Sequence, residues 1–126
     1  MLDRLPGSAG DACVAVGDRR DVRSGGIGAG PFDEARTSFA DQTESGTPAQ
    51  VSLYFIPANG PGSKPGLTVT MDNTTTGATQ TLHETTTADA DVWTFFQTEI
   101  PVPAPGKYRI RATSGGDSGC FLVTFR

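Results

Sequence analysis

The chain has few of the residues that catalytic and metal sites usually need. Among its 126 residues are one histidine and two cysteines, whereas a zinc site normally takes four ligands rich in nitrogen and sulfur. The glycines from Gly25 to Gly30 match neither the dinucleotide-binding pattern nor the P-loop, and Pro31 stands where a helix should begin. The sequence therefore predicts a protein without a cofactor and without enzymatic activity.

Basic charge and long apolar runs are also scarce. Ten Lys and Arg against 14 Asp and Glu give a net charge of −4, which argues against the basic surface of a nucleic-acid-binding protein. No apolar run approaches the roughly 20 residues that cross a bilayer, and residues 1–11 lack the apolar region of a secretory signal. We expect no nucleic-acid partner and no membrane insertion.

Turn-forming and β-branched residues are abundant, whereas no segment has a convincing apolar stripe at helical spacing. The chain has 16 Gly and 9 Pro, and threonines cluster from Thr68 to Thr87. Threonine is comfortable on the solvent face of a strand and is a poor helix former. Short apolar runs bounded by turn residues predict an all-β protein, an antiparallel β-sandwich of the jelly-roll or Ig-like kind.

The pattern divides the single domain into two regions. Residues 1–48 are interrupted by Gly- and Pro-containing runs and predict an extended N-terminal arm with one or two short strands. The two strand candidates in the arm are Ala12–Val16 and, more weakly, Ala35–Ala40. Residues 49–126 are predicted to form the sandwich core.

The core region contains several segments with the two-residue periodicity of half-buried strands. Leu67, Val69 and Met71 alternate with polar residues, so they are predicted to face the core. The segment 79–84 has Leu82 as its only large apolar residue and is predicted to be an edge strand. The other predicted strands are 50–56, 92–100, 106–113 and 120–126, the last two forming a terminal hairpin.

The end of the chain resembles a known class of module. A W-x-F-F segment at Trp93, a Pro-rich turn, G-K-Y-x-I-x-A at Gly106, a Gly-rich turn and C-F-L-V-x-F at Cys120 follow in order. This order resembles the closing strands of extracellular bacterial sandwich modules, including carbohydrate-binding and pre-peptidase C-terminal types. The resemblance implies a sandwich architecture over roughly the last quarter of the chain. Tyr54 and Trp93 are the candidates for stacking on a sugar, with burial as the competing interpretation.

The two cysteines lie near opposite ends of the chain. Cys13 falls in the first predicted strand and Cys120 at the start of the last, so a sandwich with adjacent terminal strands would allow a disulfide. Closing a loop of about 100 residues is worth roughly 4.7 kcal/mol in the chain-entropy model. Two separate buried thiols are the alternative.

Two further motifs have a chemical and a structural interpretation. Gly116–Gly119 spells the tetrapeptide around the nucleophile of trypsin-like proteases, with His83 upstream, but the chain is too short for such a fold, so we predict a hairpin loop. Asp89 and Asp91 offer two oxygen ligands to calcium, which needs six to eight. A polar loop between strands is the favoured interpretation of that segment.

These features favour a structural or assembly protein, such as a bacteriophage capsid decoration protein made in the host cytoplasm and located in the virion. Its partner would be a larger shell or further copies of the chain. The alternative is a secreted or cell-surface module that binds a glycan or another surface. The predicted partner contacts are apolar residues of the arm and polar residues of the edge strand: Val22, Ile27, Phe32, Phe39, Thr79, Thr81 and His83.

Overall fold

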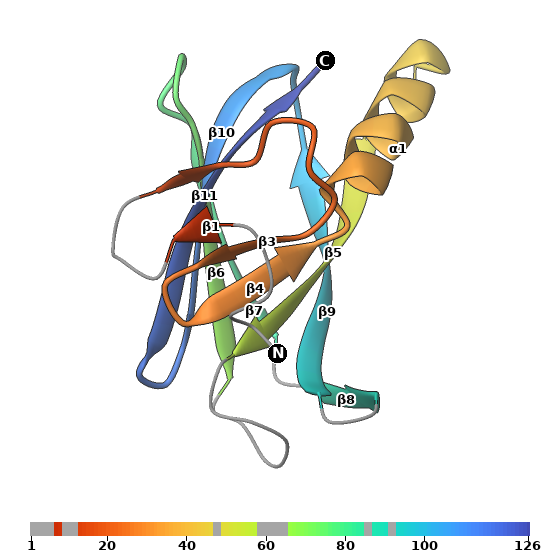
Figure 1. The fold of residues 1–126 in the computed structure, drawn as a ribbon. Coiled ribbons are helices and arrows are strands. Elements are labelled where there is room, and N and C mark those ends of the chain that lie inside the picture. Colours follow the sequence, from red (N-terminus) through yellow and green to blue (C-terminus); the bar gives the residue numbers. More distant parts are fainter. Residues whose placement is uncertain (1–6, 9–12, 47–48, 58–65, 85–86, 91–92) are drawn as a thin grey trace.

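Two β-sheets pack face to face in the computed structural model, and a single helix lies along one side of them (Figure 1). The structure describes residues 7–8, 13–46, 49–57, 66–84, 87–90 and 93–126, with the backbone alone for 7–8, 87–90 and 93–94. The predicted all-β sandwich is confirmed.

The larger sheet has six strands. In spatial order these are β1 (Gly7–Ser8), β3 (Val22–Ser24), β4 (Ile27–Gly30), β5 (Ala49–Pro57), β9 (Trp93–Val102) and β8 (Thr87–Ala90). The smaller sheet has five, in the order β2 (Val14–Ala15), β11 (Asp117–Phe125), β10 (Gly106–Ser114), β6 (Leu67–Asn73) and β7 (Thr79–Glu84). The pairings are antiparallel except for two short parallel ones, β1 with β3 and β2 with β11.

Alternation along the strands builds the core between the sheets. In β6, every second residue from Leu67 to Asn73 is buried, and in β10 Tyr108, Ile110 and Ala112 point inward as predicted. The two-residue period places one set of side chains on the inner face of each sheet. The largest fully buried side chains are Tyr108, Phe32, Phe39, Phe55, Phe96, Phe121, Phe125, Ile27, Leu53, Leu67, Met71 and Ile100.

Two hairpins shape the smaller sheet, and the second, β10–β11, is the terminal hairpin that the sequence predicts. In the β6–β7 connection, Asn73 Oδ1 accepts hydrogen bonds from the backbone N–H groups of Thr75 and Thr76, at 2.9 and 3.1 Å. Gly77 follows with a φ of 77°, a left-handed conformation that favours glycine. Strands β10 and β11 pair along their whole length, from Gly106 opposite Phe125 to Ser114 opposite Asp117.

The weak strand prediction over Ala35–Ala40 is wrong, because this segment lies in helix α1 (Phe32–Glu44). Phe32, Ala35 and Phe39 have the i, i+3, i+7 spacing of a helix face and are the buried residues of α1. Three apolar positions among mostly polar neighbours make this stripe too short to stand out in the sequence. Asp33 and Glu34 occupy the first turn, where the helix dipole favours acidic side chains.

Helix α1 is held to both sheets by its buried face. The ring of Phe32 lies 5.7 Å from that of Phe121, and the ring of Phe39 lies 5.4 Å from that of Phe125. Both partners belong to β11 of the smaller sheet, whereas α1 also packs on β5 of the larger one. The helix therefore covers the core where the two sheets diverge (Figure 1).

The described part of the predicted N-terminal arm is built into the sandwich. Strands β3 and β4 form a hairpin that extends the larger sheet from β5. The Gly-rich run supplies its turn, where Gly25 has a φ of 56° and the N–H of Gly26 donates to the carbonyl of Ser118 at 3.0 Å. This hydrogen bond joins the β3–β4 turn to the first residues of β11.

Candidate functional site

The predicted disulfide is present between Cys13 and Cys120. It links residues 107 positions apart, and their Cα atoms are 4.5 Å apart. Strand β2 lies beside β11 in a parallel pairing, with Val14 opposite Phe121, and this pairing brings the two cysteines together. The backbone N–H of Cys120 also donates to Oγ of Ser24, at 2.8 Å. The disulfide therefore fastens the start of the described chain to its last strand.

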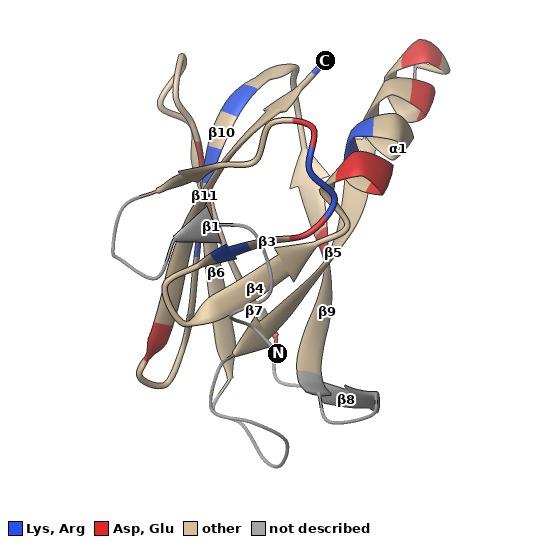
Figure 2. Ribbon diagram, viewed as in Figure 1, with Lys and Arg blue, Asp and Glu red and all other residues tan. Residues whose placement is uncertain are grey.

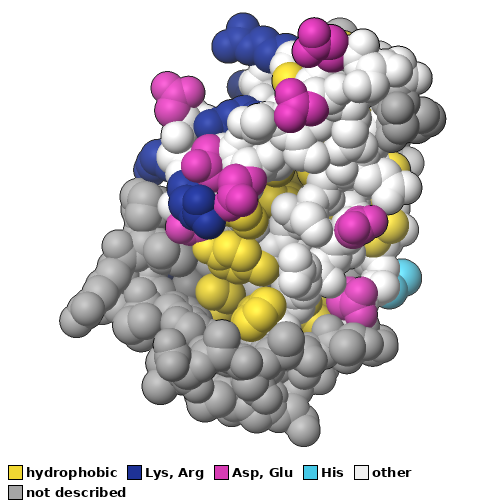
Figure 3. Space-filling view, turned by 90° about the vertical axis from the view of Figure 1, so that its right-hand side faces the viewer, with side chains coloured by type: hydrophobic (Ala, Val, Ile, Leu, Met, Phe, Trp, Pro, Cys, Tyr) yellow, Lys and Arg dark blue, Asp and Glu magenta, His cyan; other side chains and the backbone are white. Residues whose placement is uncertain are grey.

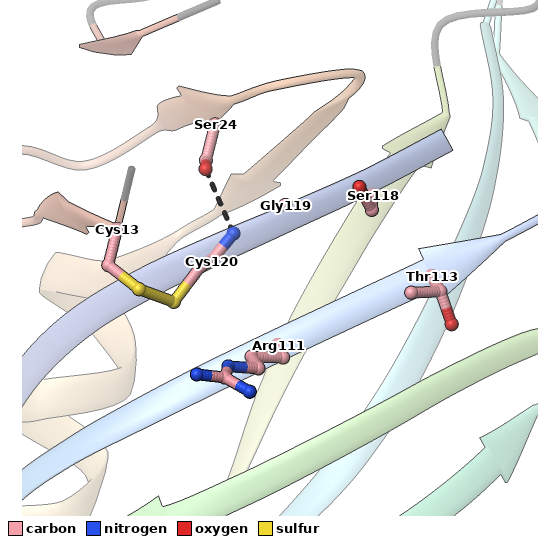
Figure 4. Close-up of a pocket in the computed structure, with 7 residues that line it drawn as sticks. All are labelled: Cys13, Ser24, Arg111, Thr113, Ser118, Gly119 and Cys120. Carbon is pink, nitrogen blue, oxygen red and sulfur yellow. Dashed lines mark hydrogen bonds between the residues drawn. A yellow bond between two sulfur atoms is a disulfide. The ribbon is translucent and has the colours of Figure 1, made fainter. Parts of the chain in front are cut away.

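A pocket of about 260 Å³ opens beside the disulfide (Figure 4). Arg111 of β10 lies opposite Cys120, and Thr113 lies opposite Ser118. Together with Ser24 of β3, these residues border the pocket with a guanidinium and three hydroxyl groups. Arg111 has no ion-pair partner among the described residues, whereas Arg109 two positions earlier binds Asp72 of β6 at 3.1 Å. The described residues that line the pocket thus offer hydrogen-bond donors and include no carboxylate or imidazole.

The protease-like residue order in the sequence is not assembled by the fold. Ser118 and His83 lie in one row across the smaller sheet, with Thr113 and Thr68 on the two strands between them. Strands are about 4.8 Å apart, so three strand spacings separate the two residues by roughly 14 Å. His83 Nδ1 instead lies 3.2 Å from Oγ1 of Thr68. The β10–β11 turn falls at Gly115 and Gly116, whereas Asp117, Ser118 and Gly119 already belong to β11, so the hairpin-loop interpretation of Gly116–Gly119 holds only for its first residue.

A second feature lies on the outer face of the larger sheet. Tyr54 and Ile56 of β5 and Phe95 of β9 point away from the core and are half-buried. The rings of Tyr54 and Phe95 meet edge to face with centroids 6.4 Å apart. We call Tyr54, Ile56 and Phe95 the aromatic face. Seen from this side, hydrophobic side chains gather next to acidic and basic ones (Figure 3).

Tyr54 is held in one orientation by its hydroxyl group. This group donates a short hydrogen bond to Oδ1 of Asp21, from the segment between β2 and β3. Burial of the phenol, followed by the hydrogen bond and the negative charge of Asp21, raises the pKa of Tyr54 well above its ordinary value of 10.0. The phenol therefore keeps its proton, and with it the hydrogen bond to Asp21, to a higher pH than an exposed tyrosine does.

Polar and charged groups border the aromatic face. Gln97 of β9 is exposed and lies directly opposite Tyr54. Arg20 forms an ion pair with Glu34 of α1 at 2.7 Å and lies 3.8 Å from the carboxylate of Asp21. Acidic side chains are concentrated on α1, whereas β10 of the opposite sheet carries basic ones (Figure 2). The aromatic face therefore has both apolar surface and hydrogen-bonding groups at its border.

Glycine at position 30 of β4 permits this arrangement. Gly28 lies opposite Ile56, and Gly30 lies opposite Tyr54. A Cβ atom on Gly30 would lie 2.9 Å from the Tyr54 hydroxyl oxygen and would also collide with Asp21. A larger residue at position 30 would therefore displace the Tyr54–Asp21 pair.

The predicted arm anchors lie in the chain's own core. Val22, Ile27 and Phe32 are 0% exposed, and Phe39 is 1% exposed. These side chains pack against the sandwich, so in this fold they offer no contact to a partner. Large apolar residues in a polar segment must be buried against something. In this fold the chain buries them in its own core.

The predicted contacts on the edge strand are placed differently. Thr79, Thr81 and His83 are exposed on β7, which lies at the edge of the smaller sheet as the sequence predicted.

A nearby pocket of about 290 Å³, between the β6–β7 hairpin and the Pro-rich segment after β9, is mostly apolar and includes Met71 and Tyr108. The sequence did not reveal this pocket, because its walls come from separate strands.

Some sequence predictions lie outside the described residues. Asp91 falls there, and the side chains of Asp89 and Trp93 belong to positions described by their backbone alone. The backbone of Asp89 lies in β8, so the predicted polar loop between strands is wrong at this residue. Within the described part of the chain, no group of three or more His, Cys, Asp or Glu side chains is placed to hold a metal ion.

Sequence reasoning singled out Tyr54 but missed Phe95, Ile56 and Asp21. Two signals were present. Ile56 shares the face of Tyr54 by the two-residue period, and of the adjacent Phe95 and Phe96 one must point outward in a strand. Nothing in the sequence pairs Asp21 with a tyrosine 33 positions away.

Comparisons with known proteins found no match for this chain. No protein-family model matches the chain, and neither curated proteins nor solved structures give a match. In the described residues, no helix is long and apolar enough to span a membrane.

Proposed function

We propose that this chain is a non-enzymatic binding module, secreted or displayed at the cell surface, that recognises a polysaccharide through the aromatic face. The observation that carries the proposal is the half-buried, edge-to-face pair of Tyr54 and Phe95 on the outer face of the larger sheet. The Cys13–Cys120 disulfide supports the location, because structural disulfides persist in oxidising compartments.

The aromatic face has the chemistry that sugar rings require. A pyranose presents apolar C–H groups on its faces and hydroxyl groups around its rim. The ring of Tyr54 offers an apolar surface, while Gln97 and Asp21 offer amide and carboxylate groups at its edge. Because the hydrogen bond to Asp21 and the contact with Phe95 already fix the ring, little side-chain entropy is lost on binding.

The capsid-decoration interpretation remains a prediction with weaker support. It relied on arm residues that contact a neighbouring shell, and Val22, Ile27, Phe32 and Phe39 are buried in the core instead. Of the residues predicted to contact a partner, those on β7 are exposed and still support this interpretation.

Binding to insoluble and soluble polysaccharides tests the proposal directly. The disulfide-intact chain would be mixed with cellulose, chitin, peptidoglycan and soluble glucans, and the bound fraction would be measured by pull-down and affinity electrophoresis. Phe95→Ala should weaken binding by about tenfold, equivalent to about 1.4 kcal/mol, because the ring that supports Tyr54 is lost.

The matched control is Thr113→Ala, an exposed change on the opposite sheet, which should leave binding unchanged. Thermal unfolding of each variant separates lost binding from lost folding. The proposal fails if the folded chain binds none of these polymers, or if Phe95→Ala binds as tightly as the unchanged chain.

A further inference from the structure

The four sheet edges of this fold differ in length. Three are formed by short strands, namely β1 and β2 with two residues each and β8 with four. Strand β7 forms the fourth edge and has six residues, Thr79–Glu84. Proteins commonly protect sheet edges with very short strands, with proline or with lysine, because a long free edge pairs with other chains.

Strand β7 has none of these protections. Its sequence is TQTLHE, without proline, lysine or arginine. Among the described strands it pairs with β6 alone, so from Thr79 to His83 its other side presents backbone donors and acceptors outward. These are the groups that strand addition uses.

The strand is also held rigidly enough to act as a template. Its register with β6 runs without a break from Thr79 opposite Asp72 to Glu84 opposite Leu67. The side-chain amide of Gln80 donates to the carbonyl of Pro101 in β9 at 2.6 Å, which ties β7 to the other sheet. Leu82 packs against the core from the inner face.

We propose that a second copy of this chain pairs with it through β7, in antiparallel orientation about a two-fold axis at Thr81. Directly opposed residues in such a pair must lie on the same face of the sheet. Two registers meet this condition and pair five residues each, one centred on Thr81 and one on Leu82. We choose the register with Thr81 opposite Thr81 of the second copy, because only this one gives all three exposed residues of β7 a counterpart. Thr79 then lies opposite His83, and Gln80 opposite Leu82.

This register is complementary to itself. Threonine opposite threonine is a favourable cross-strand pair, and from Thr79 to His83 no two acidic or two basic side chains oppose each other. The exposed outer residues of both copies stay on one side, where Thr79, Thr81 and His83 form a continuous polar row. Pairing joins the two five-stranded sheets and removes their longest free edges.

The contact is small, so the dimer should be in reversible, concentration-dependent equilibrium with the monomer. Sedimentation velocity and light scattering from low-micromolar to near-millimolar protein should show the mass rising from 13.1 kDa toward twice that value. A chain that stays monomeric throughout this range overturns the proposal.

A charge on the two-fold axis gives a selective test. Thr81→Lys places two lysines directly opposite each other in the dimer, while the monomer merely gains an exposed charge. We expect its dimer dissociation constant to rise at least about tenfold, equivalent to about 1.4 kcal/mol. Thr113→Lys, on the same sheet face but away from the edge, should dimerise as the unchanged chain does. Equal dimerisation by Thr81→Lys and Thr113→Lys would refute pairing at β7.

A cysteine trap tests the register. Oxidised Thr81→Cys should give a covalent dimer, because opposed strand residues lie within disulfide reach. Thr79→Cys should not form one, because position 79 lies opposite His83 of the second copy. The two introduced cysteines then lie on opposite sides of the two-fold axis, each two residues away from it. Efficient cross-linking through position 79 with none through position 81 would overturn the proposed register.

Discussion

Gln42 of helix α1 and Gln50 of β5 are joined by a pair of reciprocal hydrogen bonds. The side-chain amide of Gln42 donates to the carbonyl of Gln50 at 2.8 Å, and its side-chain oxygen accepts from the N–H of Gln50 at 2.9 Å. The side-chain amide of Gln42 thus pairs with the backbone of Gln50 as the peptide group of a neighbouring strand would. It fixes the last turns of α1 against the larger sheet.

Loss of this pair should loosen the helix. Gln42→Ala removes both hydrogen bonds to β5, and we expect a loss of about 1–2 kcal/mol in the free energy of unfolding. Urea denaturation followed by circular dichroism measures it. Glu44→Ala, at an exposed position near the same helix end, is the matched control. Equal midpoints for both variants would show that the pair adds no stability.

Reduction of the disulfide should have a larger effect. Opening the Cys13–Cys120 bond releases a loop of 107 residues from its constraint, and the chain-entropy model assigns about 4.7 kcal/mol to a loop near this length. We expect a lower melting temperature in reductant. The double variant Cys13→Ala/Cys120→Ala should melt similarly and no longer respond to reductant. An unchanged melting temperature on reduction would contradict this role.

Helix α1 should be essential for folding. Phe39→Ala leaves a cavity against Phe125 and should cost about 3–5 kcal/mol. Deleting residues 1–48, which the sequence analysis placed in an arm outside the sandwich core, should expose Phe121 and Phe125 and prevent cooperative unfolding. Binding of a hydrophobic dye and the loss of a cooperative thermal transition report this. Phe39→Leu serves as the milder comparison, and a cooperatively folded truncation would disprove the expectation.

Alkaline pH should destabilise the protein through Tyr54. Its pKa is raised in the folded state, so the unfolded chain loses the phenol proton first, near pH 10. The stability is therefore fully present below about pH 10 and is lost as the pH rises toward the folded-state pKa. Urea midpoints between pH 8 and 11.5 should fall more steeply for the unchanged chain than for Tyr54→Phe. Parallel pH profiles would show that the phenol is not protected.

The strands of the core could be predicted from the sequence because their signals are local. The alternation of Leu67, Val69 and Met71 defines both the strand and its buried face, and the Asn73-to-Gly77 segment defines the turn that follows. The edge position of β7 also followed, because Leu82 is its only large apolar side chain. In each case the residues that decide the structure lie within a few positions of one another.

The sequence by itself thus determined the class of fold, the strands from residue 49 onward except β8, and the terminal β10–β11 hairpin. Only the tertiary structure decided where α1 lies, that Cys13 meets Cys120, and that Asp21 holds Tyr54. The physical reason is sequence separation. The two-residue period fixes which way a side chain points, but its partner depends on which distant faces the packed sheets bring together.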